Sequence, residues 1–151
     1  MVRSKNRKGF TLVEIMVVIL IVALLGTVTT VLVLKQREGA KMDLTRSLVK
    51  DTLGKQLELY NSNIGHYPTE EEGGLKALMT KPSFSDEKLG EKWRGPYVSE
   101  DQLKDAWGNE IKYELTDEGS GGKVPHIWSM GPDGTDGSED DIRNWSDETS
   151  Q

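Results

Sequence analysis

An uncharged run of twenty residues, Ile15 to Leu34, constrains this chain more than any other feature. As an α-helix, which rises about 1.5 Å per residue, the run spans roughly 30 Å, the thickness of the hydrocarbon core of a bilayer. Glu14 stands directly before it. A carboxylate facing lipid is costly, so it implies a partner, a neutralised state, or both. The run therefore predicts a membrane helix whose entrance carries an acid in need of pairing.

A secretory signal peptide is the alternative interpretation of this N-terminus, because four basic residues precede the run: Arg3, Lys5, Arg7 and Lys8. The apolar cores of signal peptides extend over about 7–15 residues and end at a site of the A-x-A kind. This core is longer, starts next to an acid and leads to no such site. The pattern favours a retained helix, and the basic start favours a cytoplasmic N-terminus.

Composition narrows the possible partners. The 151 residues suffice for one modest domain beside the anchor. The formal net charge is −6, with 25 acidic against 19 basic residues, which argues against nucleic acid because phosphate binding needs a basic surface. The chain has no cysteine and therefore no disulfide. The residues after Leu34 are strongly hydrophilic and are expected to lie in water.

The helical signal continues past the uncharged run. All five prolines lie at position 68 or later, so a single helix from about Phe10 to Tyr60 is expected. Gly26, Gly39 and Gly54 are candidate bending points in it. Apolar residues at spacings of three to five predict one buried stripe along its second half, formed by Ala40, Leu44, Leu48, Leu53, Leu57 and Tyr60.

The remainder predicts a small head. Residues 61–65 are expected to stop the helix, and Thr69 with Glu72 matches a capping box for a short helix from about Glu70 to Met79. Contact of the acids at 70–72 with this helix N-terminus is favoured over a catalytic role. His66 is expected to be structural or exposed.

The C-terminal half predicts a hairpin. Residues 83–105 are interpreted as a loop with a turn at 95–97. Alternating apolar residues predict a strand over 111–115, residues 117–122 a hairpin connection, and residues 124–129 a second strand. All four tryptophans lie at position 93 or later, and we expect them to form an aromatic core between the sheet and the helix.

An acidic, glycine-rich segment from Ser129 to Ile142 is the candidate for metal chemistry. Calcium takes six to eight oxygen ligands from carboxylates and carbonyls in flexible loops. The segment is not an EF-hand, since Thr135, Gly137 and Ser138 stand where that pattern needs Asp or Asn, Asp or Asn, and Gly. From the residues alone, a calcium site and a solvated acidic turn remain equally open.

The N-terminal motif resembles a known family. Residues 9–14, Gly-Phe-Thr-Leu-Val-Glu, are similar to the processing motif of type IV pilins and pseudopilins. The resemblance implies that a prepilin peptidase cuts between Gly9 and Phe10 and methylates the new amine of Phe10. Glu14 is then expected to pair with the Phe10 amine of a neighbouring subunit during assembly, where two buried charges that are costly alone become tolerable together.

Three further segments, 63–69, 105–109 and 129–141, resemble the major pseudopilin family of type II secretion. Asn63, Ile64 and Ala106 depart from its pattern, at positions that affect loop rigidity. The resemblance implies an α+β, type IV pilin-like fold, with a long N-terminal helix packed on a small antiparallel sheet and a C-terminal calcium loop. It divides the chain into a leader (1–9), a membrane and assembly helix (10–34), and a periplasmic head (35–151) that includes the helix half 35–60.

The same resemblance assigns the calcium ligands. Side chains of Asp133, Asp140 and Asp141 are expected to bind the ion, with the carbonyl of Met130 and that of Thr135 completing the shell. The other two acids of the segment, Asp136 and Glu139, are expected to face solvent or support the ligands.

The function implied is structural. Anchored subunits would polymerise into a helical filament, the periplasmic pseudopilus, which drives folded proteins through an outer-membrane secretin. Minor pseudopilins and an inner-membrane assembly platform are the further partners implied. A type IV pilin for adhesion, motility or DNA uptake is the alternative, although most such pilins are expected to carry a C-terminal disulfide. An anchored hydrolase is disfavoured, because the sequence holds no nucleophile motif, phosphate loop or metal-binding histidine pair.

Overall fold

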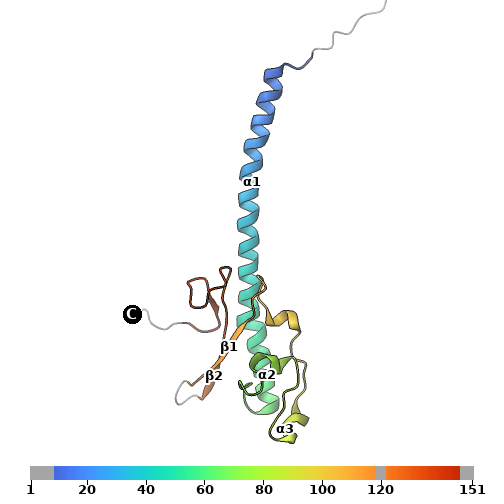
Figure 1. Ribbon diagram of the computed structural model, residues 1–151, viewed down its shortest axis with the longest axis vertical. Helices are drawn as coiled ribbons and strands as arrows, with labels where there is room; N and C mark the ends of the chain where they lie inside the picture. The colour runs from blue at the N-terminus through green and yellow to red at the C-terminus, as the bar shows by residue number, and fades with distance from the viewer. Residues whose placement is uncertain (1–8, 118–121, 147–151) are drawn as a thin grey trace, which may run out of the picture. The chain divides into compact units, whose positions relative to one another are not determined.

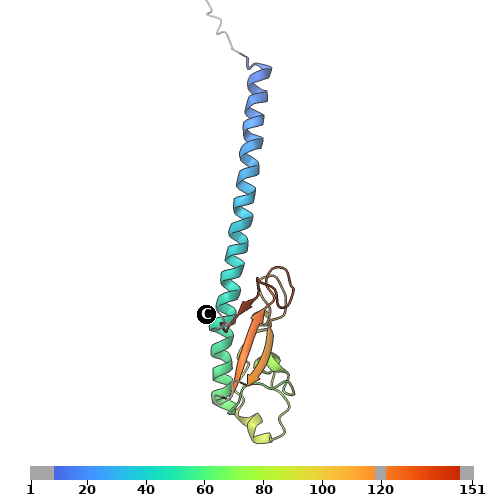
Figure 2. The same ribbon diagram turned by 90° about the vertical axis from the view of Figure 1, so that its left-hand side faces the viewer.

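The computed structural model describes residues 9–117 and 122–146, apart from the side chains of 26–34 (Figures 1 and 2). The chain divides into two compact units, Met1–Gly39 and Ala40–Gln151. All of the predicted leader except Gly9, and the middle of the predicted hairpin connection, lie outside the described residues.

The first unit contains the start of helix α1, which spans Leu12–Ser47. Its large apolar side chains from Phe10 to Leu25 are all exposed, by 48% to 80%. Within the described residues, none of the helices combines the length and the apolar character that crossing a membrane requires.

The helical spine of the second unit consists of three segments. The last turns of α1 lead into a π-helical segment, η1 (Leu48–Leu53), and then into α2 (Gly54–Ile64). Gly65 ends α2 with a φ of 100°, a left-handed conformation that glycine adopts without steric cost. The predicted stop at 61–65 is therefore confirmed, although the helix extends four residues beyond Tyr60, where its end was expected.

The buried face of this spine differs from the predicted stripe at its start. Ala40 and Leu44 are exposed, the latter by 68%, whereas Thr45 and Val49 are buried. The buried row continues backward from Leu53 at intervals of four, through Val49 and Thr45. The predicted stripe instead passed through Leu48, five residues before Leu53, which is only partly buried. From Leu53 onward the predicted stripe is buried, including Leu57 and Tyr60.

Within the described residues, a three-stranded antiparallel sheet lies beside this spine (Figures 1 and 2). Strand β1 (Lys112–Asp117) pairs with β2 (Lys123–Ser129), which pairs with β3 (Ile142–Arg143). In the register, Lys112 faces Trp128 and Ser129 faces Ile142. The predicted α+β fold is confirmed, and both predicted strands are present. Strand β3 was not predicted, because two residues are too few to show an alternating pattern.

Two predicted segments are wrong in detail. The expected helix over 70–79 is a short 3₁₀ helix, η2 (Gly74–Leu78), because Gly73 and Gly74 have positive φ angles of 94° and 57° and interrupt α-helical geometry. The segment 83–105 is not only loop, since it contains α3 (Glu87–Lys92) and the 3₁₀ helix η3 (Glu100–Leu103). Asp86 caps α3 by accepting a hydrogen bond from the Lys88 amide at 2.9 Å.

The core is mainly aliphatic, although Tyr60 is fully buried in it, and the prediction of a core formed by the tryptophans is only partly correct. Trp93 and Trp107 pack against it while partly buried. Trp145 instead stacks on His126, with ring centroids 4.2 Å apart, and Trp128 meets Trp145 edge to face. The buried hydrophobic residues come from η1, α2, η2, β2, β3 and two connecting segments: Val49, Leu53, Leu57, Tyr60, Ile64, Leu75, Ala77, Leu78, Val98, Ile111, Ile127 and Ile142.

Candidate assembly motif and acidic loop

The predicted processing and assembly residues lie at the start of α1. Gly9 and Phe10 precede the helix, so the peptide bond between them lies in non-helical chain. Thr11 caps the helix, because its hydroxyl oxygen accepts a hydrogen bond from the Glu14 amide at 3.2 Å. Glu14 therefore sits in the first helical turn, where the helix dipole favours a negative charge. This local geometry places the acid three residues from the cap and four from Phe10.

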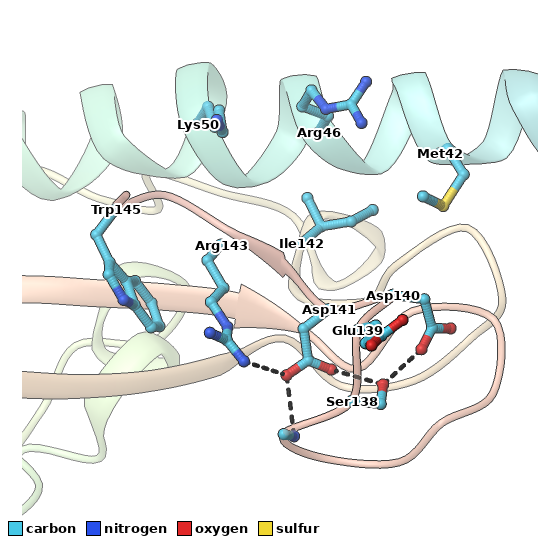
Figure 3. Close-up of a pocket in the computed structure, with 11 residues that line it drawn as sticks. Met42, Arg46, Lys50, Ser138, Glu139, Asp140, Asp141, Ile142, Arg143 and Trp145 are labelled. Carbon is cyan, nitrogen blue, oxygen red and sulfur yellow. Dashed lines mark hydrogen bonds and ion pairs between the residues drawn. The ribbon is translucent and has the colours of Figure 1, made fainter. Parts of the chain in front are cut away.

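The three predicted carboxylate ligands converge on one hydroxyl group. Ser138 Oγ lies 2.5 Å from Asp140 Oδ1, 3.3 Å from Asp141 Oδ1 and 3.4 Å from Asp133 Oδ1. Figure 3 shows Ser138 between Asp140 and Asp141. A hydroxyl has one proton to donate, so it satisfies only one of the three carboxylates at a time. The loop thus gathers negative charge around a group that cannot neutralise it.

Further donors hold these carboxylates in place. Asp133 accepts from the Thr135 amide at 2.7 Å, and Asp140 from the Asp133 amide at 3.2 Å. Asp141 accepts from the Gly137 amide at 2.9 Å. The hydrogen bond from Ser138 lowers the pKa of Asp140, because it stabilises the ionised carboxylate. The Asp140 carboxylate therefore stays charged to a lower pH than an ordinary aspartate does.

The donor chemistry of this loop fits a hard cation. Its side-chain oxygens are carboxylates and a hydroxyl, which are the ligands that calcium prefers. In the parts of the chain that the structure describes, no group of three or more His, Cys, Asp or Glu side chains is arranged to hold a metal ion as it stands. The convergence on Ser138 shows that the three acids are neighbours, although their oxygens bind the loop's own donors.

An open groove of about 640 Å³ runs beside the loop. Met42, Arg46 and Lys50 line it from the helical spine, and residues 137–143 with Trp145 line it from the other side (Figure 3). Arg143 reaches Asp141 at 3.2 Å. Sequence reasoning did not place these basic residues near the loop, because Arg46 and Lys50 are about ninety residues away along the chain.

Of the three acids at 70–72, Glu72 makes contacts that hold the fold together. Glu72 Oε2 accepts from the Thr69 amide at 3.0 Å, and the Glu72 amide donates to Thr69 Oγ1 at 3.3 Å, so the predicted capping box is confirmed. Glu72 also accepts from the Tyr60 hydroxyl at 3.2 Å and lies 2.8 Å from His66 Nε2. His66 thus has the predicted structural role.

A helical spine, a small antiparallel sheet and an N-terminal processing motif define the class of pilin-like subunits. Residues 32–145 match the family described as type II secretion system protein G, and residues 4–30 match the prokaryotic N-terminal methylation motif. The chain belongs to the protein G family of type II secretion, the major pseudopilins. The predicted resemblance is therefore confirmed, and the alternative of a type IV pilin is not favoured.

Individual relatives agree with this assignment. The type II secretion system core protein G of Pectobacterium carotovorum is 38% identical over 145 residues, covering 93% of this chain and 86% of the relative. Those of Klebsiella michiganensis and Aeromonas hydrophila are 34% and 35% identical, each match covering 95% of this chain and 96% of the relative. The crystal structure of the major pseudopilin of enterohaemorrhagic Escherichia coli is similar, with a TM-score of 0.54 and 30% identity over 74% of this chain and 92% of that one. Members of this family are structural components of the secretion system.

Proposed function

We propose that this subunit is held in the inner membrane by residues 10–34 and polymerises into the periplasmic pseudopilus of a type II secretion system. The observation that carries the proposal is the exposure of every large apolar side chain from Phe10 to Leu25, by at least 48%, in a chain of this family. An exposed apolar surface of this extent marks a site that contacts a membrane or another protein. Lipid covers it in the waiting monomer, and the helices of neighbouring subunits cover it in the fibre.

Processing and charge pairing link these two states. Prepilin peptidase cuts the bond between Gly9 and Phe10, which precedes the helix, and methylates the Phe10 amine. The Glu14 carboxylate of one subunit then binds the amine of a neighbour. Each charge alone is costly in an apolar bundle, and the pair sets the axial register of adjacent helices.

The acidic loop is proposed to bind one calcium ion. Carboxylates of Asp133, Asp140 and Asp141 would hold it, together with the carbonyls of Met130 and Thr135. The support is the convergence of the three carboxylates on Ser138, at 2.5 to 3.4 Å. When bound, the ion would supply positive charge that the Ser138 hydroxyl and the loop amides do not carry. The loop residues then keep one conformation, which presents a fixed surface for neighbouring subunits and for minor pseudopilins.

The fibre would act mechanically. Addition of subunits at the inner-membrane assembly platform would extend it toward the outer-membrane secretin and push folded proteins outward. The head needs no active site for this role, because the free energy comes from a separate cytoplasmic ATPase.

Overproduction of the full chain together with a prepilin peptidase tests the proposal. We expect sedimentable fibres in the periplasm whose subunits begin with Phe10-Thr11-Leu12 on N-terminal sequencing. Assembled material that starts at Met1 would contradict the processing step. Processed subunits that stay monomeric at high expression would contradict polymerisation, and fibres only on the cell surface would favour a type IV pilin.

A further inference from the structure

Asp105 is a buried carboxylate to which the proposed function gives no role. It is 7% exposed and lies in the turn between η3 and β1. Burying a carboxylate is unfavourable unless hydrogen bonds or charges compensate it. Asp105 Oδ1 accepts from the amides of Trp107 at 2.9 Å and Asn109 at 2.8 Å. Those two bonds stabilise the turn itself.

The second oxygen of Asp105 points to other partners. Asp105 Oδ2 accepts from Ser129 Oγ at 2.7 Å and from Asn109 Nδ2 at 3.2 Å. Ser129 is fully buried at the end of β2, where the acidic loop begins. This half of the carboxylate therefore connects the turn to the loop, across 24 positions of sequence.

Ser129 and Asn109, the two side chains that bind Asp105 Oδ2, also form hydrogen bonds with Gly131. The Gly131 amide donates to Ser129 Oγ at 3.1 Å, and the Gly131 carbonyl accepts from Asn109 Nδ2 at 3.2 Å. Both polar groups of this residue are thereby fixed through side chains that bind Asp105. Met130, whose carbonyl is a proposed calcium ligand, lies between the two anchored residues.

Gly131 in turn touches the acids of the loop. A β-carbon built on Gly131 would lie 2.5 Å from the Asp140 carbonyl oxygen and 2.7 Å from Asp140 Oδ2. The backbone at 131 and the carboxylate at 140 are thus in close contact. A chain of contacts runs from Asp105 through Ser129 and Asn109 to Gly131, and from there to Asp140.

The turn is also fixed to the helical spine. The Ala106 amide donates to Thr45 Oγ1 at 3.2 Å, and Thr45 is 1% exposed. The carboxylate therefore has a rigid support on one side and the start of the loop on the other.

We propose that Asp105 is the positioning residue of the cation loop, which sets Met130 and Asp140 in place through Ser129, Asn109 and Gly131. The inference rests on the proposed calcium site and adds a residue outside the loop that determines its affinity. Asp105 does not touch the ion. It acts by fixing one edge of the site before the ion arrives, as supporting residues do around metal ligands.

Asp105→Asn in the full chain, in detergent micelles, tests the proposal. The amide nitrogen cannot accept from Ser129 Oγ or Asn109 Nδ2, while the shape is unchanged. Calcium affinity by titration calorimetry is expected to fall about 10-fold. Hydrogen exchange of the Trp128 indole, which donates to Asp136 at 2.7 Å, is expected to accelerate in the absence of calcium. Protection of the buried Leu57 amide should persist.

Asp101→Asn is the matched control, because this exposed aspartate lies four residues away, in η3. It should change neither readout. Ser129→Ala removes the link without altering Asp105, and it carries the test if Asp105→Asn does not fold. Unchanged calcium affinity and unchanged indole exchange would overturn the proposal, as would equal loss of protection at Leu57. If the wild-type chain binds no calcium while the exchange effect is present, the calcium site is wrong and the positioning role stands.

Discussion

Gly131 and Asp140 are in such close contact that a β-carbon at position 131 would lie 2.5 Å from the Asp140 carbonyl oxygen. Gly131 also has a φ of +64°, where a side chain costs about 1–2 kcal/mol. We therefore expect Gly131→Ala to lower the free energy of unfolding by about 2 kcal/mol or more, since overpacking adds to the backbone strain. Thermal unfolding measures this loss.

Gly137→Ala separates the two contributions. Gly137 has a φ of +82°, yet nothing lies within 4 Å of its β-carbon position. It should cost only the strain, about 1–2 kcal/mol. Equal losses at the two positions would show that the contact with Asp140 does not matter.

Calcium should stabilise the chain through its carboxylates. A ligand that binds only the folded state at 100 times its dissociation constant adds about 2.7 kcal/mol. Asp133→Ala and Asp140→Ala are expected to abolish the rise in melting temperature that calcium causes, while Glu139→Ala, at an exposed neighbour, keeps it. A calcium response that survives Asp133→Ala and Asp140→Ala would exclude this loop as the site.

Glu14 should be needed for assembly and not for insertion. Glu14→Ala and Glu14→Lys remove the carboxylate that is proposed to bind a neighbour's amine, so secretion of folded proteins should be lost while membrane extraction behaviour is unchanged. Glu91→Ala, at an exposed acid in α3, is the control and should secrete normally. Normal secretion by both Glu14 variants would rule out the charge pair.

Ionisation of the buried Tyr113 should make the free energy of unfolding depend on pH in the alkaline range. Burial, followed by the effects of Tyr67 and Glu72, raises the pKa of Tyr113 above its ordinary value. Because the folded pKa exceeds the unfolded one, the stabilisation is fully present below about pH 10 and falls as pH rises further. Tyr113→Phe should flatten that fall, measured by urea unfolding between about pH 9 and pH 11.

At neutral pH the same variant loses the hydrogen bond from the Tyr113 hydroxyl to the Pro68 carbonyl, which is 2.8 Å long. It should therefore be less stable there, by about 1 kcal/mol. A decline above pH 10 as steep as in the wild type would show that Tyr113 ionises without unfolding.

Local sequence patterns predicted the elements whose signals lie within a few residues. The capping box of Thr69 and Glu72 and the strand over 124–129 depend on near neighbours, and both are present. The exposed Ala40 and Leu44 were predicted as buried, because the buried row passes through Val49 and the polar Thr45, and a buried threonine leaves no mark in the spacing of apolar residues. Strand β3 was missed because it exists only through its pairing with β2.

The sequence by itself determined the family, the apolar N-terminal segment and the identity of the three converging acids, because each depends on a motif within one short segment of the chain. Only the tertiary structure decided that Ser138 lies among those acids, that Arg46 and Lys50 line a groove beside them, and that Asp105 reaches Ser129. Such contacts depend on how helix, turn and sheet pack together. That packing depends on the burial of apolar side chains throughout the core, so it cannot be predicted from a short segment of sequence.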